Sequence, residues 1–74
     1  MKEKILEILN DTIPGVDFEN EKALIDDGII ESLDMVAIVT QFISEFNVDL
    51  SVDDLVPENF NSVDSMVKMI ESKQ

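Results

Sequence analysis

The chain has 74 residues, of which 17 are acidic and five are lysines, so its formal net charge is −12. A chain of this length has room for one small core, since such a domain buries only about 60% of its unfolded surface. The negative field repels phosphate backbones and anionic lipid head groups, which excludes nucleic acid and membrane surfaces as expected partners. Because 45% of the residues are hydrophobic, we expect a folded domain despite the charge.

Cysteine and histidine are both absent from the sequence. No disulfide or thiolate metal site is therefore possible, and the side chain most often used as a general base near neutral pH is missing. The apolar residues after Met1 to Lys4 are interrupted by Glu7, unlike a signal peptide, and no window approaches the length of a membrane span. We expect a cytoplasmic, monomeric protein without a bound metal or a catalytic site of its own.

The first predicted element is a helix over residues 2–13, ended by Pro14-Gly15. Its apolar residues recur at helical spacing: Ile5, Leu6, Leu9 and Ile13. A long loop should follow from Gly15 to Glu31, with a turn at Asp27-Gly28. Its scattered apolar residues suggest that the loop is attached to the core, and they are Val16, Phe18, Leu24, Ile25, Ile29 and Ile30.

The strongest helical pattern covers Ser32 to Phe46. One apolar stripe is predicted to face the core, formed by Leu33, Val36, Val39, Ile43 and Phe46. A helix of this length spans roughly 22 Å, about the width of a small domain, so it should border most of the fold.

A short helix is predicted over Val52 to Leu55, before Pro57, and a final helix after Asn61. Asn61 is the expected cap of that last helix, with Asp64 as its capping-box partner. The apolar stripe of the last helix is Val63, Met66, Val67 and Ile70. Residues 1–74 thus predict one domain of the all-α class, a small four-helix bundle with three main helices, one short helix and a long loop between the first two main helices.

The segment from Leu24 to Val36 carries the most informative motif, Glu31-Ser32-Leu33-Asp34. It resembles the phosphopantetheine attachment region of acyl and peptidyl carrier proteins, whose core is Asp-Ser-Leu at the start of the second helix. The resemblance covers nearly the whole chain. The flanking features that agree with it are Asp27-Gly28, Glu45-Phe46 followed by Val48, and Pro57-Glu58-Asn59-Phe60 before Ser62-Val63.

The resemblance implies that Ser32 bears 4′-phosphopantetheine, transferred from coenzyme A by a separate phosphopantetheinyl transferase. The thiol of that arm would hold an acyl or aminoacyl group as a thioester, which a loading enzyme attaches and downstream acyl-transfer enzymes receive. In carriers of this kind the cargo also folds back between the helices, and the loop residues Leu24, Ile29 and Ile30 would allow a partly open core.

Two other roles for Ser32 follow from its residue type alone. Serine is among the best helix N-caps, so a purely structural role is the simplest alternative. A role as a hydrolase nucleophile is excluded, because serine needs an adjacent base and the chain has no histidine. A phosphate at the start of a helix is favoured by free backbone N–H groups and the helix dipole, while Glu31 and Asp34 oppose it with like charge.

The second helix is the partner-recognition surface that the resemblance implies. Its expected contact residues surround Ser32 and are Glu31, Leu33, Asp34, Met35 and Ile38. Glu45 adds negative charge on the same helix. Met35 and Ile38 have a second interpretation as core residues, because two apolar stripes on one helix do not both face inward.

Several residues depart from the usual carrier pattern. Glu31 replaces the aspartate before the modified serine, Ala37 stands where carriers of fatty acid synthesis commonly have glutamate, and Ile43-Ser44 interrupt their acidic run. These changes favour a specialised acyl or aminoacyl pathway over primary fatty acid synthesis. The alternative from another class is an unmodified acidic helical module that binds a basic partner, as an inhibitor or a nucleic-acid mimic does.

Overall fold

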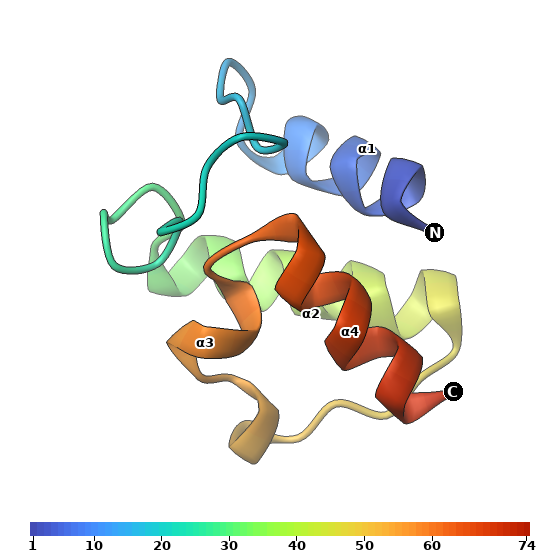
Figure 1. Ribbon diagram of the computed structural model, residues 1–74. Helices are drawn as coiled ribbons and strands as arrows, with labels where there is room; N and C mark the ends of the chain where they lie inside the picture. Colours follow the sequence, from blue (N-terminus) through green and yellow to red (C-terminus); the bar gives the residue numbers. More distant parts are fainter.

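Helices and connecting segments make up the whole fold, without a strand, in a computed structural model that describes residues 1–74 (Figure 1). In chain order the elements are α1 (Lys2–Thr12), α2 (Ser32–Phe46), the 3₁₀ turn η1 (Val52–Asp54), α3 (Pro57–Phe60) and α4 (Val63–Lys73). The predicted all-α bundle of three main helices and one short one, with a long loop before α2, is therefore confirmed.

The helix α1 packs against both α2 and α4, and α3 packs against α4. Figure 1 shows α1 above the other helices, α2 behind α4, and the loop between α1 and α2 on one side of the bundle. The molecule measures 28 × 23 × 20 Å, so α2 runs along most of one dimension.

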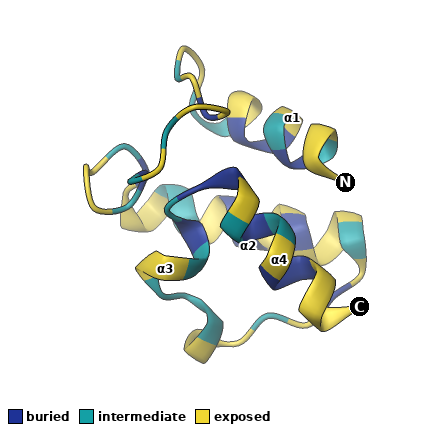
Figure 2. Ribbon diagram, viewed as in Figure 1, coloured by how far each residue is buried: buried dark blue, intermediate teal, exposed yellow.

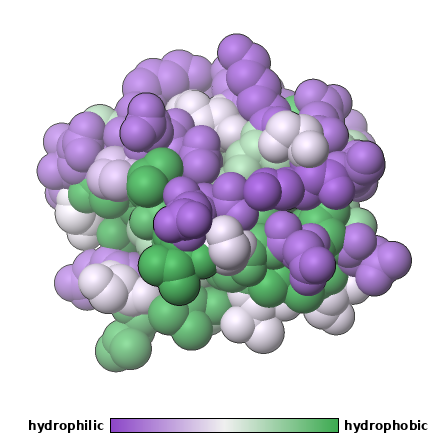
Figure 3. All heavy atoms as spheres, turned by 90° about the horizontal axis from the view of Figure 1, so that it is seen from below, coloured by the Kyte–Doolittle hydropathy of each residue, from purple (hydrophilic) through white to green (hydrophobic).

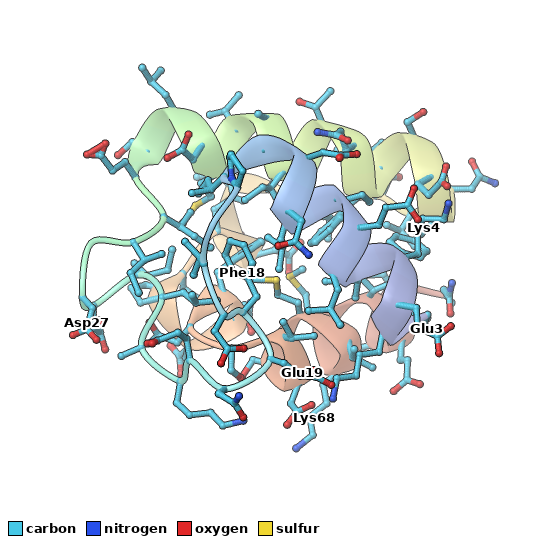
Figure 4. All side chains as sticks on the ribbon, turned by 90° about the horizontal axis from the view of Figure 1, so that it is seen from above. Glu3, Lys4, Phe18, Glu19, Asp27 and Lys68 are labelled. Carbon is cyan, nitrogen blue, oxygen red and sulfur yellow. The ribbon has the colours of Figure 1, made fainter.

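The core is one cluster of 15 buried hydrophobic residues (Figure 2). The loop between α1 and α2 contributes Phe18, Leu24 and Ile30 to it, while Val16, Ile25 and Ile29 pack against it partly buried. Figure 4 shows Phe18 turned toward the middle of the molecule and Asp27 at the outer edge of the loop. The prediction that this loop is attached to the core is confirmed.

The core-facing side of α2 differs from the predicted stripe. Its buried residues are Ile38, Val39 and Phe42, with Met35 and Phe46 packed against them. Leu33, Val36 and Ile43 are exposed instead. The prediction was wrong for those three residues because α2 carries two apolar stripes, and only one of them faces α1 and the core cluster.

The segment between α2 and α4 was also predicted only in part. Val52–Asp54 is a single 3₁₀ turn and not an α-helix, and the short α-helix of the bundle is α3, which begins at Pro57. Proline is well suited to the first helical position, because the N–H it lacks has no partner there in any helix. Pro57 therefore begins a helix where we expected it to follow one.

The cap of α4 is Ser62 and not Asn61. The hydroxyl oxygen of Ser62 accepts a hydrogen bond from the backbone N–H of Ser65 at 3.1 Å, so Asp64 is not the capping partner. Asn61 lies one residue before the cap, and its side chain is hydrogen-bonded to the loop that leads into α2.

Candidate functional site

A tight turn delivers the chain to the start of α2. The carbonyl oxygen of Leu24 accepts hydrogen bonds from the backbone N–H groups of Ile29 and Ile30, at 2.9 and 3.0 Å. Gly28 has a φ of 74°, in the left-handed region that favours glycine, which confirms the predicted turn at this position. Leu24 and Ile30 are buried, so the turn is anchored at both ends immediately before Glu31 and Ser32.

Glu31 is the N-cap of α2, and Ser32 is its first helical residue. Glu31 and Asp34 form a capping box, in which the backbone N–H of Glu31 donates to Oδ2 of Asp34 at 3.4 Å. Ser32 is exposed, and its hydroxyl makes no hydrogen bond within the protein. The structural alternative, in which Ser32 caps the helix, is therefore wrong.

The hydroxyl of Ser32 lies at the positive end of the α2 dipole, beside backbone N–H groups that have no acceptor within the helix. Such a position is favourable for a covalently attached phosphate. Glu31 is exposed and Asp34 partly exposed, so solvent screens their repulsion of that phosphate. No side chain is hydrogen-bonded to the hydroxyl of Ser32 in this structure.

Exposed apolar side chains lie next to Ser32 on α2. Leu33 is 85% exposed and Val36 is 61% exposed, and the two lie three residues apart on one helical face. Met35 is half-buried against the core, and Ile38 is completely buried. The prediction that Ile38 contacts a partner was wrong for this structure, because no part of its side chain reaches the surface.

A second exposed apolar side chain belongs to η1, where Val52 is 82% exposed. Leu50, Leu55 and Val56 nearby are only partly buried. Figure 3, seen from the side on which η1 and α3 lie in Figure 1, shows apolar side chains over much of this face. This side of the molecule is accordingly less polar than the net charge suggests.

Glu45 is on α2 but does not belong to the surroundings of Ser32. It lies near the other end of the helix, roughly 20 Å away along the axis. Its carboxylate pairs with the ammonium of Lys4 on α1 at 3.0 Å, and this hydrogen bond and charge raise the pKa of Lys4 above its usual value. The charge of Glu45 is therefore partly compensated within the protein.

One surface groove is present, with a volume of about 200 Å³ between α1 and α2. It is mostly polar and is lined by Lys4, Glu7, Ile8, Asp11, Gln41, Ser44 and Glu45. This groove does not include Leu24, Ile29 or Ile30. No group of acidic side chains lies close enough together to hold a metal ion.

Asn61 is the residue near this site whose role sequence reasoning missed. Its side chain contacts the loop at Ile25 and Asp26, which precede it by about 35 residues. The only signal in the sequence was the residue type, because an amide both donates and accepts hydrogen bonds. A partner so distant in the chain is not indicated by local spacing.

Comparison with known proteins gives no further guide to this site. No family model matches the chain, and neither curated proteins nor solved structures yielded a match. Among the helices of the structure, none combines the length and apolarity needed to cross a membrane.

Proposed function

We propose that the protein is an acyl or aminoacyl carrier whose Ser32 bears 4′-phosphopantetheine. The observation that carries the proposal is the state of Ser32: an exposed hydroxyl at the first position of α2, without a hydrogen bond and without a capping role. A serine that does no structural work at a helix N-terminus is free for modification by another protein. The resemblance of Glu31-Ser32-Leu33-Asp34 to the carrier motif supports the same residue.

The protein's own residues would do three things for the arm. The start of α2 would hold the phosphodiester near unpaired N–H groups, an interaction worth about 0.3 to 1 kcal/mol at an exposed site. The capping box of Glu31 and Asp34 keeps the helix end formed, so that the attachment point is fixed. When bound, the arm supplies the thiol that this cysteine-free chain lacks.

The partners in this proposal are enzymes. A phosphopantetheinyl transferase would transfer the arm from coenzyme A, a loading enzyme would attach the cargo, and acyl-transfer enzymes would receive it, all in the cytoplasm. Leu33 and Val36 would contact these enzymes, since they are the exposed apolar residues closest in sequence to Ser32 on α2. Exposed apolar side chains of this kind are suited to the buried centre of an interface. The nearby carboxylates would attract basic surfaces of the partner enzymes.

The test is intact mass after incubation with coenzyme A, Mg²⁺ and a phosphopantetheinyl transferase, using both a broad-specificity enzyme and the cognate one. The wild type should gain the mass of one phosphopantetheine group, and Ser32→Ala should gain none. Ser44→Ala, which removes another exposed serine of α2, is the matched control and should gain mass as the wild type does. No gain in the wild type with either enzyme would refute the carrier function and favour the acidic binding module.

A further inference from the structure

The side chain of Asn61 forms a set of hydrogen bonds to the loop that precedes α2. Its Oδ1 accepts from the backbone N–H groups of Ile25 at 3.0 Å and Asp26 at 3.1 Å. Its Nδ2 donates to Oδ2 of Asp26 at 3.2 Å. The backbone carbonyl of Asn61 also accepts from the N–H of Leu24 at 2.9 Å. Both the NH₂ group and the carbonyl oxygen of the Asn61 amide are thus hydrogen-bonded to the same loop, at Ile25 and Asp26.

Asn61 is itself held in place on both sides. Phe60, which ends α3, is completely buried, and Ser62 and Val63, which begin α4, are buried as well. The backbone N–H of Asn61 also donates to the carbonyl oxygen of Pro57 at 2.8 Å, closing α3. The amide therefore projects from a junction between two helices whose neighbouring residues are buried in the core.

The contacts continue from this junction to Ser32. Leu24 is bonded to Asn61 through its N–H, and its own carbonyl accepts from Ile29 and Ile30. Ile30 is buried and directly precedes the capping residue Glu31. The turn of residues 24–30 thus connects the junction of α3 and α4 with the first residues of α2.

From this arrangement we infer that Asn61 is a positioning residue for the modification of Ser32. By fixing the turn of residues 24–30, it holds the start of α2 in the one orientation that a modifying enzyme binds. The inference rests on the proposed function for the enzyme, but the fixing of the turn is a property of the protein alone. Without Asn61 we expect the bundle to stay folded, because Asn61 is not one of its core residues. We expect the turn to open more often, because only the burial of Leu24 and Ile30 and the hydrogen bonds within the turn would still hold it.

The polarity of the amide offers a specific test. Asn61→Asp keeps an acceptor for the N–H groups of Ile25 and Asp26, but it places a second carboxylate next to that of Asp26. The two carboxylates should repel each other and push the turn away from the junction. The double variant Asn61→Asp/Asp26→Asn exchanges amide and carboxylate, and so restores a donor opposite an acceptor. Rescue by the double variant separates a specific pairing from a general loss of stability.

Asn59 provides a matched control, since it lies in α3 only two residues before Asn61. Its Nδ2 donates to the backbone carbonyl of Asp54 at 2.9 Å, so Asn59→Ala also removes a hydrogen bond from an asparagine side chain to the backbone of another segment. That segment is η1 and not the turn before α2. Asn59→Ala should therefore leave Ser32 and the turn unaffected.

The experiment combines amide hydrogen exchange with the kinetics of arm transfer. In Asn61→Ala and Asn61→Asp, we expect the amides of Ile29 and Ile30 to exchange roughly tenfold or more faster, while those of α4 stay protected. The KM for transfer to Ser32 should rise about tenfold with kcat little changed, because the enzyme must first order the turn. The double variant should recover both values, and Asn59→Ala should resemble the wild type.

The outcomes separate the two proposals. Unchanged exchange at Ile29 and Ile30 in both Asn61 variants would overturn the inference, whether or not the wild type is modified. A wild type that gains no phosphopantetheine would refute the proposed function, while the exchange data would still decide whether Asn61 holds the turn. Faster exchange with unchanged transfer kinetics would overturn the positioning role. Should Asn61→Ala fail to fold, the Asn61→Asp variant and its rescue carry the test.

Discussion

The carboxylate of Asp34 accepts a hydrogen bond from the backbone N–H of Glu31, and this pair encloses Ser32 within the first turn of α2. Capping is thereby done by the two acidic residues and not by the serine between them. The acids that we expected to act on a partner consequently have a structural role as well. The hydroxyl that serine would ordinarily use as a cap is left free.

Removing the hydroxyl of Ser32 should leave the free energy of unfolding unchanged to within about 0.5 kcal/mol, as for other surface changes without a structural contact. The matched control is Ser62→Ala, because Ser62 is a buried N-cap bonded to Ser65. That variant should lose about 1 kcal/mol. Urea unfolding of both variants gives the comparison, and equal losses would show that Ser32 has a structural role after all.

Leu33 and Ile38 should separate partner binding from core packing on α2. Leu33→Ala should slow arm transfer to Ser32 but change stability by less than about 0.5 kcal/mol, because the side chain is 85% exposed. Ile38→Ala should cost about 2 to 5 kcal/mol, because it leaves a cavity in the core. Transfer kinetics and urea unfolding measure the two effects. Normal transfer to Leu33→Ala would place the docking surface elsewhere.

Asp54 should make part of the stability depend on acidic pH. The backbone N–H of Ser51 and then the ammonium of Lys73, at 2.9 and 3.1 Å, lower the pKa of Asp54 below its ordinary value of 3.8. Since the native pKa is the lower one, the stabilisation is complete above the ordinary value and is lost as the pH falls through the native value.

The Asp54→Asn variant isolates this contribution, because all other carboxylates are common to both proteins. The variant should be less stable than the wild type near neutral pH, and the difference should shrink below about pH 4. Urea unfolding over a series of pH values provides the measurement. A difference that stays constant or grows on acidification would contradict the assignment.

Salt should stabilise the protein, because 17 acidic residues face only five lysines. Four of those lysines form six ion pairs, mostly between exposed side chains. Exposed pairs are each worth about 0 to 1 kcal/mol, so their loss by screening is small. The stability gained by screening the mutual repulsion of the remaining carboxylates should exceed the stability lost from the ion pairs. Raising NaCl from about 0.01 M to about 0.5 M should therefore increase Tm, and a decrease would show that the ion pairs dominate.

The boundaries of the two longest predicted helices were accessible from the sequence because local signals mark them. Pro14-Gly15 ends the pattern of α1, and the apolar periodicity from Ser32 to Phe46 coincides with α2 as observed. The predicted end of α2 also has a local cause: Asn47 adopts a φ of 54°, a left-handed conformation that asparagine tolerates better than most residues. Such signals act over a few residues, so they are visible without the fold.

The face of α2 that enters the core was not accessible in the same way. Periodicity identifies the apolar positions of a helix, but here it identifies two stripes of comparable strength. The choice between Leu33 and Ile38 as core residues depends on where α1 and the rest of the core cluster lie, and most of those residues are distant in sequence. The composition of the candidate site depends on that choice. In the structure Ile38 is buried, and the exposed apolar residues next to Ser32 are Leu33 and Val36.

By itself, the sequence determined the all-α class, the extents of α1 and α2, the attachment of the long loop to the core and the position of Ser32 near a helix start. These depend on composition and on spacings within a few residues. Only the tertiary structure decided that Glu31 and Asp34 cap α2 while Ser32 stays free, and that Asn61 holds the turn before it. A side chain's choice among competing hydrogen-bond partners, including those distant in the chain, depends on the packing that brings them together.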